Sequence, residues 1–295
     1  PFSFMATAEV IAFLGATPVF CDIYAETFNL NPDDLEKAFD KAINKGLKPK
    51  AILPVNLFGL PARYRLIKKF AKEKNLFLLE DGAQGFGGSI GGQKACSFGD
   101  VSSTSFFPAK PLGCYGDGGA IFTNDDELAK KMLSIRVHGS GKDQYDNVRI
   151  GINGRLDTIQ AAILIEKLKI FNAEINKRNK IADRYTKKLN ENYITHHVPS
   201  NYKSSWAQYS ILAKDMKHRE EIMRSLKKDN IPSMIYYKTP LHLMKAFEFL
   251  NYKKGDFLNS EKISSRIFSI PMHPYLTKNH QNIIIDKLND LSKKI

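Results

Sequence analysis

The segment SFFPAKPLGCYGDGG, residues 105–119, places a single lysine, Lys110, between an apolar run and a glycine-rich turn. Few charged residues lie near it in the sequence. Such surroundings remove water from an amine, lower its pKa and make it nucleophilic. A solvated lysine in a surface loop is the alternative, and this segment alone does not decide between the two.

The sequence on either side of Lys110 predicts an α/β fold. Residues 101–106 read as a strand leading to the lysine, and residues 76–81 (LFLLED) form a continuous apolar run that ends in two acids. Such runs are typical of buried parallel strands, and residues 63–74 between two of these runs have the helical period. Because ligands bind at the carboxyl ends of strands in such sheets, Asp81 is expected at a ligand site.

The remaining pattern predicts a large domain over residues 1–175 and a smaller α/β domain over residues 176–295. The helical stretch from 155 to 190 is long enough for a kink or an interdomain role. Further helices are expected over residues 6–14, 31–44, 125–137, 218–229 and 281–293. Further strands are expected over residues 18–23, 51–55, 120–123, 206–212 and 231–237.

Composition narrows the class of protein. The 295 residues are 43% hydrophobic, enough for a large core, and contain no run of about 18 apolar residues of the kind that spans a membrane. The net charge of +13 lies in solvated lysine-rich stretches without a nucleic-acid-binding module, so we expect attraction of acidic small substrates and no nucleic-acid partner. The three cysteines lack paired or metal-ligand spacing, which predicts a reducing, cytoplasmic location and no metal site.

Asp81 and Lys110 together match a known cofactor chemistry. In pyridoxal phosphate enzymes a lysine forms a Schiff base, and a carboxylate keeps the pyridine nitrogen protonated. Pairing with a pyridinium makes the burial of a carboxylate tolerable. Taken singly, Asp81 fits a helix cap and Lys110 fits a loop charge.

Four motifs at consistent spacing resemble the DegT/DnrJ/StrS family of pyridoxal phosphate sugar aminotransferases. They are EDGAQ at 80–84, SFFPAKPLG at 105–113, GDGGA at 116–120 and GINGRLDTIQAA at 151–162. The resemblance implies an aspartate-aminotransferase-like large domain of fold type I, with a mixed, mostly parallel sheet between helices. It also implies a smaller C-terminal α/β domain.

The resemblance assigns roles to individual residues. It implies that Lys110 binds pyridoxal 5′-phosphate covalently and then moves protons, and that Asp81 pairs with the pyridine nitrogen. It places Gln84 near the ring hydroxyl, Ser105 on the phosphate and Phe4 against the ring. Asn153 matches a residue that reaches the phosphate from a partner subunit, which implies a homodimer with shared active sites.

Other positions have two interpretations. Arg155 suits bidentate binding of substrate phosphates, but it and Asp157 also suit the start of a helix. His138 fits either a loop or the cofactor pocket. Gly82 and Pro111 stand where the family more often has alanine and asparagine.

The beginning of the chain predicts an N-terminally truncated protein. Residues 1–8 (PFSFMATA) are apolar and carry neither an initiator methionine nor a secretory signal. The family's Ser-Gly-Thr loop, which binds the cofactor phosphate at a helix N-terminus, is expected before Pro1.

The expected reaction transfers an amino group from glutamate to a keto group of a nucleotide sugar. Residues 235–242 and 269–276 resemble family members that act at the C3 keto group of UDP-N-acetylglucosamine uronates, in surface polysaccharide or glycan biosynthesis. The resemblance makes four residues candidate substrate contacts: Tyr236, Tyr237, His242 and His273. The alternatives are a C4 aminotransferase acting on a 4-keto-6-deoxy sugar, packing roles for these four residues, and a cofactor-binding regulator without turnover.

Overall fold

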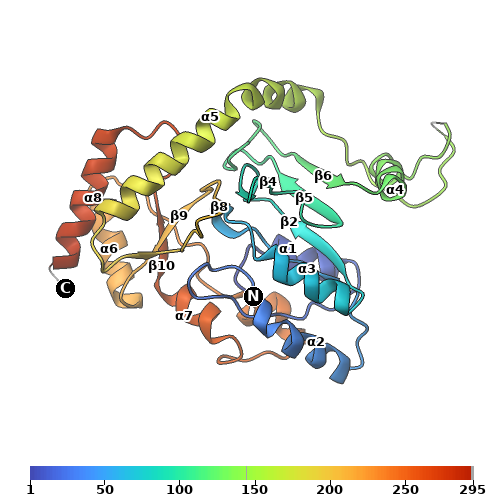
Figure 1. Ribbon diagram of the computed structural model, residues 1–295, viewed down its shortest axis with the longest axis horizontal. Helices are drawn as coiled ribbons and strands as arrows, with labels where there is room; N and C mark the ends of the chain where they lie inside the picture. Colours follow the sequence, from blue (N-terminus) through green and yellow to red (C-terminus); the bar gives the residue numbers. More distant parts are fainter. Residues whose placement is uncertain (144, 294–295) are drawn as a thin grey trace.

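The computed structural model describes residues 1–143 and 145–293 (Figure 1). Its helices are α1 (Ala6–Phe13), α2 (Leu35–Asn44), α3 (Tyr64–Glu73), α4 (Asp126–Arg136), α5 (Thr158–Lys188), α6 (Met216–Lys228), α7 (Leu258–Arg266) and α8 (Lys278–Lys293). Its strands are β1 (Ala51–Ile52), β2 (Phe77–Asp81), β3 (Ser89–Ile90), β4 (Gln93–Lys94), β5 (Val101–Ser105), β6 (Gly119–Thr123), β7 (Ile194–Thr195), β8 (Tyr202–Lys203), β9 (Tyr209–Leu212) and β10 (Ile267–Ile270). Short 3-10 turns lie at Pro32–Asp34, Leu57–Gly59, Leu241–Leu243 and Lys245–Leu250.

The central sheet has the strand order β1-β2-β5-β6. β1, β2 and β5 run parallel, and β6 runs antiparallel to β5. This mixed, mostly parallel sheet confirms the predicted α/β class. Parallel pairing brings the carboxyl ends of β2 and β5 to one edge.

Helix α3 is held against the sheet by the apolar side of its helical repeat. Tyr64, Ile67 and Ala71 lie on this side and pack with residues of β1 and β2 in one core cluster. The Tyr64 ring also stacks on Phe98 with ring centroids 4.5 Å apart. Positions i, i+3 and i+7 share one face of a helix, so the sequence period alone directs these side chains to the sheet.

The segment that contains Lys110 closes the connection between β5 and β6. Phe106 N donates to the Gly118 carbonyl, and Cys114 N donates to the Phe106 carbonyl, both at 2.7 Å. The loop folds back so closely that a Cβ on Gly113 would lie 2.5 Å from the Pro108 carbonyl oxygen. Only glycine fits this crossing without a shift of the backbone.

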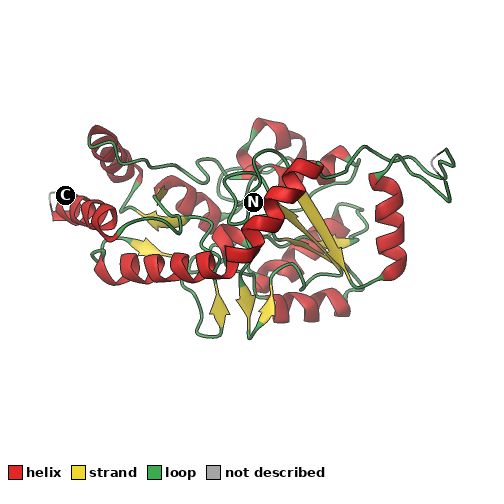
Figure 2. Cartoon of the chain, turned by 90° about the horizontal axis from the view of Figure 1, so that it is seen from above, coloured by secondary structure: helices red, strands yellow, loops and turns green. Residues whose placement is uncertain are grey.

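Helix α5 packs against both halves of the molecule (Figures 1 and 2). Its first half joins a core cluster with the Lys110 loop, through Leu164, Phe171 and Ile175 packed with Phe106, Leu112 and Cys114. Its second half joins a different cluster with β9, β10, α6 and α8, through Ile181, Ala182 and Tyr185. The predicted long helix is therefore present as one continuous element.

The C-terminal part has an antiparallel sheet of strand order β10-β9-β7. Its chain also returns to the N-terminal segments: Phe2 and Phe58 share a core cluster with Ile263 and Ile267. Among the described helices, none combines the length and hydrophobicity that crossing a bilayer requires.

Two predicted strands are wrong. Residues 18–23 and 231–237 each form a single β-bridge, between Ile23 and Leu30 and between Met234 and Ser269. Pro18 and Pro232 lack the amide hydrogen that a strand ladder needs. β10 and α7 were not predicted from the sequence.

Candidate active site

The two residues that the sequence singles out lie at the same edge of the central sheet. Asp81 is the last residue of β2 and pairs with Ser103 of the parallel strand β5, which ends two residues later at Ser105. Lys110 follows β5 in a turn. In this turn the backbone N of Lys110 donates to the Phe107 carbonyl at 2.8 Å. The strand register therefore delivers an acid and an amine to one place.

The carboxylate of Asp81 is held on both oxygens. Ala83 N donates to Oδ1 at 3.1 Å, and the Thr7 hydroxyl donates to Oδ2 at 2.8 Å. Thr7 lies in the first turn of α1, so an element far away in sequence orients this side chain. Two donors of fixed position leave the carboxylate little freedom to rotate.

The amine of Lys110 is partly withdrawn from water. Burial lowers the pKa of the Lys110 ammonium, and the negative charge of Asp81 opposes part of this lowering. A lysine with a lowered pKa is neutral more of the time, and neutral amine is the nucleophilic form. Lys110 is therefore prepared both to attack a carbonyl carbon and to carry a proton.

Gln84 is buried where three distant segments meet. Its Oε1 accepts from Phe58 N at 2.6 Å, and its Nε2 donates to the Tyr237 hydroxyl at 2.9 Å. Its backbone carbonyl accepts from the Ser205 hydroxyl at 2.6 Å. Burial raises the pKa of the Tyr237 phenol, so this partner stays neutral.

The side chain of Phe4 is exposed, so the aromatic ring of a ligand could stack on it. It precedes α1 and is 56% exposed, whereas Phe2, two residues earlier, is 3% exposed. Its ring centroid lies 6.3 Å from that of Tyr237. Phe4 and Thr7 thus come from the same short segment, one aromatic and one bonded to Asp81.

Five further predicted residues make no hydrogen bond to Asp81, Lys110 or Gln84 within the described chain: Ser105, His138, Asn153, Arg155 and Asp157. The Ser105 hydroxyl accepts from Phe107 N at 3.2 Å. Asn153 and Arg155 are exposed, and Arg155 Nε donates to Asn153 Oδ1 at 3.1 Å. Asp157 is the N-cap residue of α5 but makes no side-chain capping bond, and His138 adopts a left-handed φ of 55° beside Asn153 in the loop.

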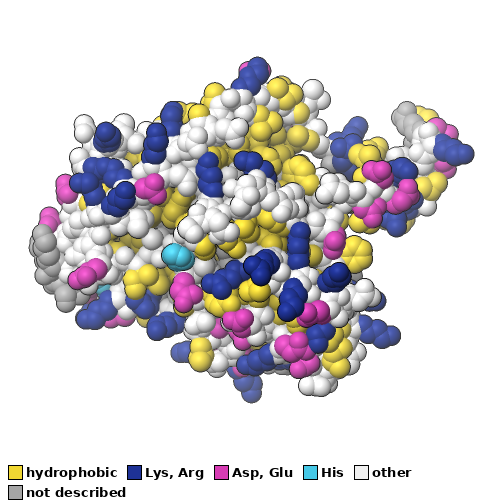
Figure 3. Space-filling model, viewed as in Figure 1, with side chains coloured by type: hydrophobic (Ala, Val, Ile, Leu, Met, Phe, Trp, Pro, Cys, Tyr) yellow, Lys and Arg dark blue, Asp and Glu magenta, His cyan; other side chains and the backbone are white. Residues whose placement is uncertain are grey.

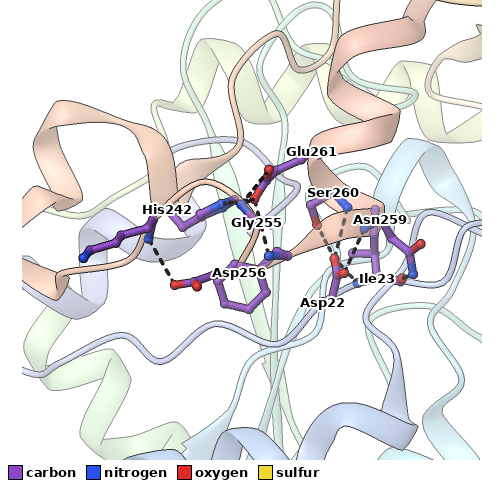
Figure 4. A network of polar contacts seen from close by, with 10 residues as sticks. Asp22, Ile23, His242, Gly255, Asp256, Asn259, Ser260 and Glu261 are labelled. Atoms are coloured by element: carbon purple, nitrogen blue, oxygen red, sulfur yellow. Dashed lines mark hydrogen bonds and ion pairs between the residues drawn. The ribbon is translucent and has the colours of Figure 1, made fainter.

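His242 lies in a polar network around the start of α7 (Figure 4). Its Nε2 is 3.0 Å from Glu261 Oε1, and its side chain is fully buried. Glu261 also accepts from Gly255 N, while Asp22 accepts from the amides of Asn259 and Ser260 at the beginning of the helix. Within the described chain, His242 contacts this network and its ring packs on Phe257 at 4.7 Å.

His273 is exposed near Arg178 of α5. Arg178 itself donates to the Trp206 carbonyl at 3.0 Å, at the junction of α5 with the C-terminal part. Tyr236 adjoins Tyr237, with ring centroids 5.8 Å apart. Of the four candidate substrate contacts, the structure brings Tyr236 and Tyr237 to the group around Gln84.

The sequence did not predict three residues that form hydrogen bonds with the predicted site residues. Thr7, Phe58 and Ser205 bond to Asp81 and Gln84 from distant positions. One signal was present: Ser3 and Thr7 are four residues apart, a spacing that places hydroxyls on one side of a helical turn. No comparable signal marked the other two.

The group suits pyridoxal phosphate. It offers a desolvated amine, a carboxylate fixed by two donors and an exposed aromatic ring, which are the features that such a cofactor needs for attachment, protonation of its ring nitrogen and stacking. Over residues 1–143 and 145–293, no cluster of three or more metal-ligating side chains is found.

The comparisons with known proteins agree with this chemistry. The model of the DegT/DnrJ/EryC1/StrS aminotransferase family matches residues 1–289. A UDP-2-acetamido-2-deoxy-3-oxo-D-glucuronate aminotransferase from Pseudomonas aeruginosa is 43% identical over 276 residues, which are 93% of this chain and 73% of that protein.

Solved structures give the same result. A DegT DnrJ EryC1 StrS aminotransferase from Brucella abortus superposes with a TM-score of 0.93 and 49% identity, over 98% of this chain and 77% of that chain. NtdA from Bacillus subtilis, solved with bound cofactor PMP, superposes with a TM-score of 0.88 and 28% identity, over 99% of this chain and 66% of that chain. The chain therefore belongs to the DegT/DnrJ/EryC1/StrS aminotransferase family and is a pyridoxal phosphate-dependent sugar aminotransferase.

Proposed function

We propose that this enzyme transfers the amino group of glutamate to the C3 keto group of a UDP-linked N-acetyl-hexosamine uronate, for the synthesis of a surface polysaccharide or glycan. The observation that carries aminotransfer is the desolvated Lys110 amine under the influence of Asp81. The choice of C3 and of a uronate is supported by the name of the relative from Pseudomonas aeruginosa.

In this proposal each residue at the sheet edge has a defined task. Lys110 would hold the cofactor through its amine, and the same amine would carry a proton to and from the substrate carbon. Asp81 holds the proton on the ring nitrogen, Gln84 contacts the ring hydroxyl, and Phe4 covers the ring. Bound pyridoxal phosphate supplies the electron sink for the carbon that loses its proton. Ser105 donates to the phosphate.

The anionic substrate fits the charge of the protein. The chain carries a net charge of +13, and lysine and arginine side chains are spread over the face shown in Figure 3. A positive field raises the rate at which a nucleotide sugar with two phosphates and a carboxylate encounters the protein. Tyr236 and Tyr237, beside Gln84, are proposed substrate contacts. The further proposed contacts are Arg155, His242 and His273.

We also propose a homodimer with shared active sites. Helix α4 and the loop after it project from the body of the molecule (Figures 1 and 2). This projecting segment exposes apolar side chains, with Ile150 at 95% and Ile152 at 62% exposure, next to Asn153. A second copy that covers these side chains would receive Asn153 at its cofactor phosphate.

The division of the chain into domains at about residue 175 is part of the proposal. It is supported by α5, whose first half packs with the Lys110 loop and whose second half packs with the C-terminal sheet.

The deciding experiment offers purified enzyme, glutamate and either a UDP-linked 3-keto uronate or a UDP-linked 4-keto-6-deoxy sugar. NMR of the product then locates the new amine. We expect amination at C3 of the uronate. Turnover of the 4-keto sugar alone would refute the C3 assignment, and bound cofactor without turnover of either sugar would favour a regulatory role.

A further inference from the structure

A short chain of hydroxyl groups leads from the segment before α1 to Asp81. Ser3 Oγ lies 3.1 Å from Thr7 Oγ1, and Thr7 Oγ1 lies 2.8 Å from Asp81 Oδ2. Ser3 is 7% exposed, so the chain of hydroxyls begins in the protein interior. No role follows for either hydroxyl from the assignments above.

The direction of these hydrogen bonds is fixed by chemistry. A carboxylate only accepts, so the single hydroxyl hydrogen of Thr7 points to Asp81. Thr7 Oγ1 can then only accept from Ser3, and Ser3 must donate. The chain therefore runs in one direction, from Ser3 through Thr7 to Asp81, and each bond polarises the next.

The hydroxyls have no competing task at the helix start. The N-cap residue of α1 is Met5, which provides no side-chain cap. Ala83 N holds the other oxygen of Asp81 at 3.1 Å, so Thr7 supplies the second of two points that define the carboxylate plane. Without Thr7 the carboxylate can rotate about its remaining bond.

We propose that Thr7 is a positioning residue for the reaction, supported by Ser3, which orients Asp81 toward the cofactor's ring nitrogen and holds it as an acceptor. The inference rests on the proposed role of Asp81. Phe4 comes from the same segment, so one turn of chain both covers the ring and sets the carboxylate that serves it. Charge-assisted bonds of this kind are stronger than neutral ones.

The test compares holoenzymes of Thr7→Val, Thr7→Ser and Ser3→Ala with the unmodified protein. Thr7→Val keeps the shape of the side chain and removes the hydroxyl, whereas Thr7→Ser keeps the hydroxyl. Thr186→Val is the control, because Thr186 Oγ1 makes a partly buried bond of 2.9 Å to Tyr209 Oη away from the site. The readouts are kcat, KM for glutamate and the pH midpoint of the visible absorption of the bound cofactor.

We expect Thr7→Val to lower kcat about tenfold or more, with KM changed much less, which corresponds to the loss of one hydrogen bond to a charged group. Its absorption midpoint should move to higher pH, because a ring nitrogen that is protonated less of the time repels a positive charge at the lysine-bound end less. Ser3→Ala should show a smaller change in the same direction. Thr7→Ser and Thr186→Val should match the unmodified protein.

The inference is overturned if Thr7→Val keeps the absorption midpoint and a kcat within about twofold of the unmodified protein. It is also overturned if Thr186→Val changes both by as much, because the effect would then be one of general stability. If Thr7→Val does not fold, the Ser3→Ala shift decides by the same criteria. If the unmodified protein itself shows no visible cofactor band, the proposed function fails, and the inference fails with it.

Discussion

Gly82, the residue after Asp81, has no room for a side chain. A Cβ at this position would lie 2.3 Å from Cys96 Sγ and 3.0 Å from the Ser103 carbonyl oxygen. Cys96 in turn has a φ of 69°, in the left-handed region that favours glycine. The Cys96 side chain therefore occupies the space beside the site that a side chain at position 82 would need.

This complementarity predicts a coupled pair of substitutions. Gly82→Ala alone should destabilise the protein by about 1–3 kcal/mol, because overpacking forces neighbouring atoms to move. Cys96→Gly in the same chain should recover at least half of this loss, since it removes the clashing sulfur and relieves the φ of 69°. Urea unfolding of the two single variants and the double variant measures the coupling. A double variant no more stable than Gly82→Ala would contradict the shared-volume account.

At this scale the sequence predicted the reacting residues better than their supports. Asp81 and Lys110 each carry a local signal, an apolar strand that ends in acid and a lysine inside an apolar, glycine-rich loop, and the two together with the surrounding motifs identified the site. Two partners of Gln84 carry no such local signal, because Phe58 and Ser205 reach it only through the fold. His242 was singled out by the sequence as a candidate substrate contact, whereas in the structure its side chain is buried and bonded to Glu261 in a network at the start of α7.

Strand β2 is the element on which the site depends. Successive residues of a strand point to opposite faces, so Glu80 points away from Asp81. Its carboxylate accepts from Asn56 Nδ2 at 2.8 Å, Cys96 N at 2.6 Å and Phe98 N at 2.7 Å, with further bonds from Gly99 N and Ser102 Oγ. A buried charge satisfied by this many donors fixes the end of the strand.

Glu80→Gln tests this anchoring. The amide nitrogen of glutamine cannot accept, so buried donors lose their partner, and we expect a loss of about 2–5 kcal/mol in the free energy of unfolding. Glu36→Gln is the control, because Glu36 is exposed and pairs with Lys74 on the surface. It should cost under about 1 kcal/mol. Equal losses in the two variants would remove Glu80 from this role.

Whole helices and strands were predicted correctly where the same pattern of apolar residues continued along the whole element. The helices α2, α3 and α6 follow clear 3.6-residue patterns, and β2 follows a continuous apolar run. The strand predicted over residues 231–237 is absent because Pro232 cannot donate to a ladder and the chain bends after Met234 to bring Tyr237 to Gln84. Such a bend is set by a tertiary contact, which local propensity does not contain.

At the scale of the whole molecule, the buried residue His196 makes the free energy of unfolding depend on pH. Its ring packs on Trp206 with centroids 4.5 Å apart, and among the described residues neither ring nitrogen has a hydrogen-bond partner. Burial lowers the pKa of His196 from 6.5 to about 3, with a smaller contribution from His197. The folded protein therefore keeps this imidazole neutral.

The sign of the pH dependence follows from this shift. As the pH falls below 6.5, His196 is protonated in the unfolded chain before it is protonated in the folded one, so stability is lost between pH 6.5 and about 3. The slope contributed by one such group is at most about 1.4 kcal/mol per pH unit. His196→Phe should remove this part of the slope, and the exposed neighbour variant His197→Phe should keep it. Thermal unfolding from pH 7 to pH 4 that showed the same slope in both variants would contradict the assignment.

The central claim is that Lys110, at the end of β5, is the residue that carries the cofactor. Borohydride reduction of the holoenzyme converts the lysine–cofactor bond into a stable one, and mass spectrometry of its peptides then identifies the modified lysine. We predict one pyridoxyl-modified peptide, the one that contains Lys110, and its loss in Lys110→Ala. A modified peptide that contains another lysine, with Lys110 unmodified, would contradict the account.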